Sequence, residues 1–203
     1  MAQVNNESVL ATLQEKFGDA IEHAYEPYGM LTAFVKREQI IDILRFLKED
    51  STIQMNFLTS LCGIHYPNNE GKELGVIYHL HSFTNNFRMR LEVFFPSADV
   101  DMPTATVLWP TANWMEREAF EFFGINFVGH PDLRIILNVE DMDYHPLLKQ
   151  YPLEDDTRTD KDDRYFGRTD GNKGVHFDVF PGKAQLPKKL ANNAYALCSS
   201  IPI

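Results

Sequence analysis

Two neighbouring runs that alternate between apolar and other residues constrain this chain more than any other feature of its sequence. Residues 87–95 read Phe-Arg-Met-Arg-Leu-Glu-Val-Phe-Phe, and residues 75–81 place Val76, Tyr78 and Leu80 two apart. Successive side chains of a β-strand point to opposite faces, so each run predicts a strand with one apolar face. The loop of residues 82–86 between them makes the pair a β-hairpin.

Shorter alternating runs predict three more strands. Residues 20–37 contain two of them, separated by Glu-Pro-Tyr-Gly at residues 26–29, which is typical of the turn of a hairpin. Residues 54–66 form another apolar run that fits a strand. Cys62 lies within this run beside Gly63, and we expect it to be a buried core thiol rather than a nucleophile.

Apolar residues recur at helical spacing in three further segments. Residues 6–17 carry one apolar face, with Asn5 or Asn6 as the cap, and residues 40–47 carry another. A third helix is expected from Asn113, as its cap, to Phe123, with Glu116 reaching back to Asn113 and Gly124 as the stop. The chain is therefore expected to be α+β, with helix and hairpin units in the order α-β-β-α-β-β-β-α.

The residue pattern of the sequence changes after Gly124. Prolines and glycines interrupt every apolar cluster there, and residues 140–164 contain nine acidic and four basic residues. We therefore expect residues 1–124 to form the α+β core domain. Residues 125–203 are expected to form an extended C-terminal arm that packs on partner subunits.

Charge and hydropathy exclude several classes of partner. The 19 basic and 29 acidic residues give a net charge of −10, which repels phosphate backbones, so nucleic acid is not an expected partner. No apolar leader follows Met1, and no run approaches the roughly 18 apolar residues of a membrane span. We expect a cytosolic chain that reaches a membrane only through a complex.

The sequence also lacks the common cofactor motifs. Cys62 and Cys198 are too few to hold an iron–sulfur cluster, and the glycines never take the spacing that cradles a nucleotide phosphate. We therefore expect no cofactor in this chain and no catalytic or metal-binding residue.

One arrangement would allow metal chemistry. His79 and His81 are two apart on a predicted strand, so they share a face and could ligate a metal together with a carboxylate from Glu116, Glu118 or Glu121. A free-standing metal hydrolase is thus an alternative. The plainer interpretation is that the histidines lie on the solvent face of a hairpin and that the carboxylates stabilise the start of a helix.

The segment from Trp109 to Leu153 carries a highly specific pattern. Glu-Arg-Glu at residues 116–118 is followed by an aromatic residue, an acid, Phe-Gly-Ile and then Gly-His-Pro-Asp-Leu-Arg at residues 129–134, with His-Pro-Leu at residues 145–147 further on. This pattern resembles the C subunit of the proton-pumping NADH:quinone oxidoreductase, respiratory complex I. The resemblance places the partner interface and family signature at Glu116, Arg117, Glu118, Gly124, Gly129, His130, Pro131, Asp132, Leu133, Arg134, His145, Pro146, Lys149, Tyr151 and Pro152.

The resemblance implies a structural subunit of the hydrophilic arm of the complex, which couples electron transfer from NADH to quinone with proton translocation. FMN, iron–sulfur clusters and quinone would then be bound by partner subunits. The expected partners are the quinone-site subunit and neighbouring iron–sulfur subunits, and the expected location is the cytoplasmic face of the cell membrane. The equivalent subunit of a membrane-bound hydrogenase or of a quinone oxidoreductase with another electron donor is the alternative.

The sequence departs from the family pattern at a few positions. Glu121 stands where Asp is usual, Ile135 where a second Arg often follows, and Leu148 and Gln150 where an Arg and an Asp often flank Lys149. The last three changes remove charges that could pair across an interface, so the resemblance indicates partner contacts near His130 more strongly than near Lys149. For Arg134, two roles are open, a local ion pair with Asp132 or a contact with the quinone-site subunit.

Overall fold

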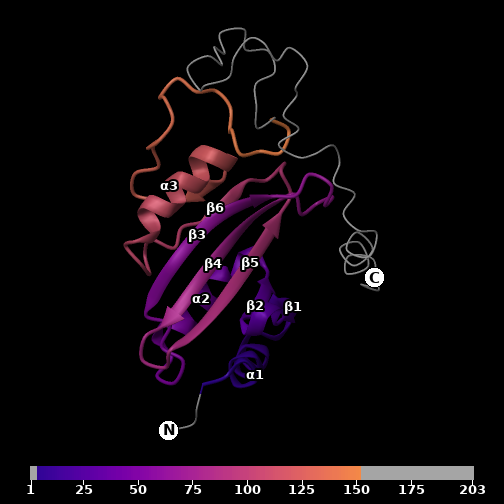
Figure 1. Cartoon of the computed structure of the whole chain (residues 1–203), viewed down its shortest axis with the longest axis vertical. Helices are drawn as coiled ribbons and strands as arrows, with labels where there is room; N and C mark the ends of the chain where they lie inside the picture. The colour runs from indigo at the N-terminus through magenta and orange to yellow at the C-terminus, as the bar shows by residue number, and fades with distance from the viewer. Residues whose placement is uncertain (1–3, 152–203) are drawn as a thin grey trace, which may run out of the picture. The chain divides into compact units, whose positions relative to one another are not determined.

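A computed structural model describes residues 4–151 of the chain (Figure 1). One mixed five-stranded sheet has the order β1-β2-β5-β4-β3, and a second sheet consists of β6 and β7. The expected order α-β-β-α-β-β-β-α is present, with two short strands added to it. The elements are α1 (Asn6–Phe17), β1 (Ile21–Tyr25), β2 (Leu31–Val35), α2 (Ile40–Glu49), β3 (Phe57–His65), β4 (Leu74–Ser82), β5 (Phe87–Phe95), β6 (Asp101–Pro103), α3 (Ala112–Phe123) and β7 (Asn126–Val128).

The central hairpin of β4 and β5 follows the alternation of the sequence closely. The strands are antiparallel, with Tyr78 opposite Leu91 and Val76 opposite Val93, so these side chains share one face of the sheet. The hairpin of β1 and β2 joins it through a parallel pairing of β2 with β5, which places Ala33 opposite Leu91 on the same face. The apolar positions of four strands therefore form one continuous core surface.

The helices cover this surface. Val9 and Leu13 of α1, Ile43 and Leu44 of α2, and Ala119 of α3 are all buried in a single hydrophobic cluster with the apolar side chains of the strands. The capping of α1 is as expected, because the Asn5 side chain accepts a hydrogen bond from the backbone N–H of Ser8 at 2.8 Å. Figure 1 shows α3 beside β3, at the end of the sheet away from α1.

The start of α3 differs from expectation. The helix begins at Ala112, after Thr111, and Glu116 does not reach back to Asn113. Its carboxylate instead bonds to residues that precede the helix by several positions, so the expected capping arrangement is wrong. The end of α3 is confirmed, because Gly124 takes a left-handed conformation (φ 75°) and donates its N–H to the Phe120 carbonyl.

Cys62 is exposed rather than buried in the core. The register of β3 against β4 shifts between Leu58 and Ser60, so that one extra residue lies in β3. This bulge turns both Leu58 and Leu61 toward the core, and Cys62 consequently points to the opposite face. A simple alternation of side chains along residues 54–66 could not predict the outward orientation of Cys62.

The compact unit that contains the sheet continues past Gly124 through the described residues. Ile125 and Phe127 are buried in the core, and β7 pairs in parallel with β6. Residues 125–151 thus pack with the core, and the structure shows no boundary at Gly124. The remainder of the expected arm, residues 152–203, lies outside the described residues. Within residues 4–151, no helix has the length and apolar character needed to cross a membrane.

Candidate functional site

The first acidic residue of the signature, Glu116, is fully buried beneath α3. Its carboxylate accepts hydrogen bonds from the Thr104 hydroxyl and the Ala105 backbone N–H, both at 2.6 Å. Burial raises the pKa of Glu116 to about 7, although both hydrogen bonds act to lower it. Glu116 therefore fixes the loop between β6 and α3 to the helix, where it is a structural group with no access to solvent.

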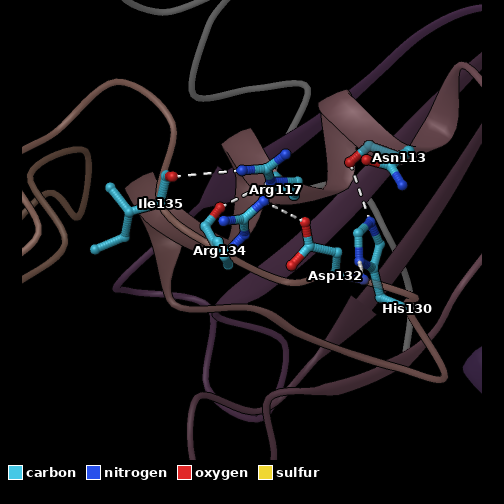
Figure 2. Close-up of polar contacts among 6 residues, drawn as sticks. All are labelled: Asn113, Arg117, His130, Asp132, Arg134 and Ile135. Atoms are coloured by element: carbon cyan, nitrogen blue, oxygen red, sulfur yellow. Dashed lines mark hydrogen bonds and ion pairs between the residues drawn. The ribbon is translucent and has the colours of Figure 1, made fainter.

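Arg117 extends from α3 to the segment that follows β7. Its Nε donates to the Arg134 carbonyl at 2.9 Å, and its second guanidinium nitrogen donates to the Ile135 carbonyl at 3.5 Å (Figure 2). The guanidinium carbon lies 4.9 Å from the centre of the Trp114 ring, in cation–π contact. A buried arginine with these partners holds the backbone of residues 134–135 against α3.

Glu121 lies one helical turn after Arg117 on the same side of α3 and holds the next stretch of chain. Its carboxylate accepts the backbone N–H groups of Ile136, Leu137 and Asn138, at 2.8 Å for the first. Desolvation raises the pKa of Glu121, but the three backbone donors outweigh it, and the pKa lies below its ordinary value. We call residues 134–138 the clamped segment, since Arg117 binds its carbonyls and Glu121 its N–H groups.

His130 fixes the part of the chain that leads from β7 into the clamped segment. Its Nδ1 accepts a hydrogen bond from the Asp132 backbone N–H at 3.0 Å, so the proton of the neutral ring lies on Nε2, which donates to the Asn113 carbonyl at 3.1 Å. Figure 2 shows this ring between α3 and the chain that follows β7. The arrangement ties the signature histidine to the first turn of α3.

Asp132 and Arg134 form an ion pair at 2.7 Å at the surface. The Arg134 side chain is 72% exposed, so most of the guanidinium remains accessible to another molecule. The hydrogen bond and charge of Arg134 lower the pKa of Asp132. The local ion pair of Arg134 is therefore present, and an exposed pair of this kind contributes at most ~1 kcal/mol.

A second loop crosses the C-terminal end of α3. Nδ1 of His145 donates to the Glu121 carbonyl at 2.9 Å, and the Leu147 N–H donates to the Phe122 carbonyl. The His145 ring lies so close to Gly124 that a Cβ at that position would be 2.7 Å from the ring. The signature thus needs glycine at 124 both for its positive φ and for the contact with His145.

The remaining signature residues take varied positions. Lys149 donates its backbone N–H to Nδ1 of His65 at the end of β3, at 3.0 Å. Burial lowers the pKa of His65, which keeps this nitrogen available as an acceptor. Leu133 packs on the core, whereas Glu118, Gly129, Pro131 and Tyr151 are exposed, Pro146 is half-buried and Pro152 lies outside the described residues.

Several residues that build this site were missed by sequence reasoning. Thr104 and His65 each supply one partner to a signature residue, and nothing in their own neighbourhoods marks them, whereas Asn113 was expected as a helix cap and instead offers its carbonyl to His130. The sequence did indicate that Arg117 and Glu121 could act together, because residues four apart lie on the same face of a helix. The target of both side chains lies 15 to 18 positions away and could not be read from that spacing.

The site presents apolar side chains to solvent on a fixed backbone. Leu137, within the clamped segment, is 68% exposed, and Val139, two residues on, and Trp114 of α3 are about as exposed. Glu140, Asp141 and Asp143 follow directly and are exposed as well. A surface that combines exposed apolar groups with a preorganised backbone is suited to protein binding.

The geometry opposes the metal-hydrolase alternative. His79 and His81 point to the face of β4 opposite Tyr78 and Leu80, and the buried Glu116 lies on the core side with α3. The sheet therefore separates the histidines from that carboxylate. Among residues 4–151, no three histidine, cysteine, aspartate or glutamate residues gather as a metal site would require.

Comparison with known proteins agrees with the signature. The family model of the respiratory-chain NADH dehydrogenase 30 kDa subunit matches residues 33–157. The C subunits of NADH-quinone oxidoreductase from Roseiflexus sp. and Geobacter sulfurreducens are 44% and 41% identical over 150 residues, which is 74% of this chain and 86% and 91% of theirs.

Solved structures show the same relationship. A trypsin-resistant fragment of Nqo5 is 29% identical and matches with a TM-score of 0.53 over 62% of this chain and 98% of the fragment. A chain of an archaeal membrane-bound sulfane sulfur reductase matches with a TM-score of 0.61 over 72% of this chain and 85% of that chain, and at 22% identity it shows the fold alone. With its signature residues assembled around α3, the chain belongs to the family of the 30 kDa subunit of respiratory-chain NADH dehydrogenase, which includes the C subunits of NADH-quinone oxidoreductase.

Proposed function

We propose that this chain is a non-catalytic structural subunit of the hydrophilic arm of NADH:quinone oxidoreductase and that it docks on the quinone-site subunit through α3 and the clamped segment. Neighbouring iron–sulfur subunits complete its contacts. FMN, clusters and quinone belong to those partners, and the chain lies on the cytoplasmic face of the membrane through the complex alone.

The observation that carries this proposal is the double clamp on residues 134–138. Arg117 and Glu121 together bind two carbonyls and three N–H groups of a segment in which the Arg134 and Leu137 side chains remain exposed. Such contacts fix a backbone that would otherwise lose conformational freedom on binding, and preorganisation of this kind raises affinity. The exposed Leu137 and Val139 would then supply apolar contacts to the partner.

A subunit of this kind serves catalysis through geometry. Electron transfer and quinone reduction require reacting groups held at fixed separations, and small displacements of such groups cost large factors in rate. A chain that positions the quinone-site subunit can therefore be essential for turnover without touching substrate. The relatives above 40% identity are named NADH-quinone oxidoreductase, which favours NADH over another electron donor.

Replacement of Arg134 tests the docking surface. Arg134→Ala should leave the thermal melting of the isolated chain within the small change expected for an exposed ion pair. Co-purification of the other subunits with the tagged chain should fall, because loss of a desolvated charged contact costs roughly 2–5 kcal/mol. Arg45→Ala is the matched control, since Arg45 forms a comparable exposed pair with Asp42 at 3.1 Å on α2.

Two results would overturn the proposal. A tagged wild-type chain that recovers no oxidoreductase subunit would contradict membership of the complex as proposed. An Arg134→Ala chain that melts at lower temperature yet assembles normally would make Arg134 an internal support. In that case the interface assigned to the clamped segment would be wrong.

A further inference from the structure

The face of the five-stranded sheet opposite the helices has an unusual composition. We call it the outer face; it carries the strand residues that alternate with the core positions, such as Arg88, Arg90 and Phe94 on β5 and His79 on β4. The five strands contain no lysine. Aromatic residues and arginine are enriched in protein interfaces and lysine is depleted from them, so this face resembles an interface more than a solvated surface.

Aromatic rings form a continuous row across one half of the outer face. Tyr25, Phe34 and Phe94 lie side by side on β1, β2 and β5, with ring centres 5.6 and 5.7 Å apart. Tyr66, which is 49% exposed, extends the row at 6.0 Å from Phe94. Each ring covers only part of its neighbours, and a partner surface could bury the ring area that stays exposed.

A second aromatic group lies at the other end of the outer face. Phe83 is 63% exposed, and its ring centre is 5.2 Å from Phe57 and 4.6 Å from His81. Nε2 of His81 and Nδ1 of His79 are buried, and neither has a hydrogen-bond partner among the described residues. Because the chain itself encloses these two nitrogens, the group that a partner can reach at this end is the exposed Phe83 ring.

The charges of the outer face are unbalanced. Glu92 is already paired with Arg90 at 3.0 Å and also lies within hydrogen-bond distance of the Tyr25 hydroxyl. Arg88 is exposed and makes no ion pair within the part of the chain that the structure describes. The outer face is therefore positive on a chain whose net charge is −10.

We propose that the outer face is a second docking surface, for another subunit of the complex whose contact surface presents carboxylates among apolar side chains. The carboxylates would pair with Arg88, while apolar groups would cover the aromatic row and the exposed Phe83 ring. This partner lies across the sheet from the clamped segment. The inference rests on the proposed function only in taking the partner from the same complex.

A second copy of this chain fits the outer face less well. Two such faces brought together would oppose arginine to arginine, and the carboxylate of Glu92 is occupied by Arg90. Like charges in a desolvated contact cost several kcal/mol. The experiment must therefore distinguish self-association through this face from binding of another subunit.

The test uses the tagged full chain in the assembled complex. Arg88→Glu and Phe83→Asp should each lower recovery of one partner subunit at least tenfold, with the Arg88→Glu defect shrinking as salt is raised, because added salt screens the new repulsion between the introduced Glu and the partner's carboxylates. Arg45→Glu, with the same charge change on the solvent side of α2, should assemble like the wild type. Thermal melting of the isolated variants excludes misfolding as the cause.

The outcomes separate this inference from the proposed function. Normal recovery of every subunit with both outer-face variants, while Arg134→Ala loses the quinone-site subunit, would overturn the inference and leave the proposed function standing. A dimer of the isolated chain that Arg88→Glu dissociates would also overturn it, since the occupant would be a second copy. Photo-crosslinking from position 83 to an acidic segment of another subunit would support it.

Discussion

At the residue scale, Glu116 has a different role in the structure from the one that the sequence indicated. Its place near the start of a helix suggested a favourable interaction with the helix dipole. The structure instead buries it with two hydrogen bonds and an elevated pKa of about 7. The role of the first signature glutamate is to hold the loop that leads into α3.

The elevated pKa of Glu116 predicts a pH-dependent stability. In the unfolded chain the carboxyl ionises near its ordinary value of 4.5, and in the folded chain near 7. Between these values the folded state binds more protons, so the free energy of unfolding should fall as pH rises, by at most about 3 kcal/mol in total. Urea unfolding between pH 5 and 8 measures this.

Glu116→Gln is the matching variant. A glutamine can still accept the Ala105 N–H and donate to the Thr104 hydroxyl, but it does not ionise. The variant should therefore lose most of the pH dependence in this window and should exceed the wild type in stability above pH 7. Parallel curves for the two proteins would show that Glu116 ionises near 4.5 in the folded state and that the expectation is wrong.

At the scale of elements, the end of α3 joins two parts of the signature. Gly124 stops the helix with a positive φ, and the His145 ring occupies the space that a side chain would need. His145 in turn binds the last turn of the helix through the Glu121 carbonyl. The helix end and the loop that crosses it are thus one packed element.

Alanine at position 124 should therefore cost more than alanine at another left-handed glycine. Gly71 has nearly the same φ, 76° against 75°, but nothing lies within 4 Å of its added Cβ. Gly71→Ala should cost ~1–2 kcal/mol for the left-handed backbone alone, and Gly124→Ala a further ~1–3 kcal/mol for crowding against His145. Equal midpoints in urea unfolding would mean that the His145 loop moves aside freely.

At the scale of the whole molecule, the core extends into the segment that the sequence assigned to an arm. Ile125 and Phe127 are buried, and each stabilises the fold by roughly 1.5–3 kcal/mol. A chain ending at Gly124 should thus be less stable than one ending at Tyr151 by about 3–6 kcal/mol. Urea unfolding of the two truncated chains measures the difference, and similar midpoints would place the boundary at Gly124 after all.

Patterns that depend only on a segment's own geometry were predictable from the sequence. The alternation of residues 87–95 identified β5, the spacing of residues 6–17 identified α1 with Asn5 or Asn6 as its cap, and Gly124 marked the end of α3. The α+β class and the family signature also followed from local order. In each case the periodicity of side chains around the segment's own axis carries the information.

Tertiary structure alone decided which distant groups meet. The short strands β6 and β7 exist because residues 101–103 and 126–128 pair with each other, and three residues carry too little alternation to reveal a strand. The bulge in β3 turned Cys62 outward, and Glu116 and Glu121 found their partners in loops outside α3. A buried polar group binds whichever donor packing brings within ~3 Å, and that choice is made by the whole chain rather than by its neighbours in sequence.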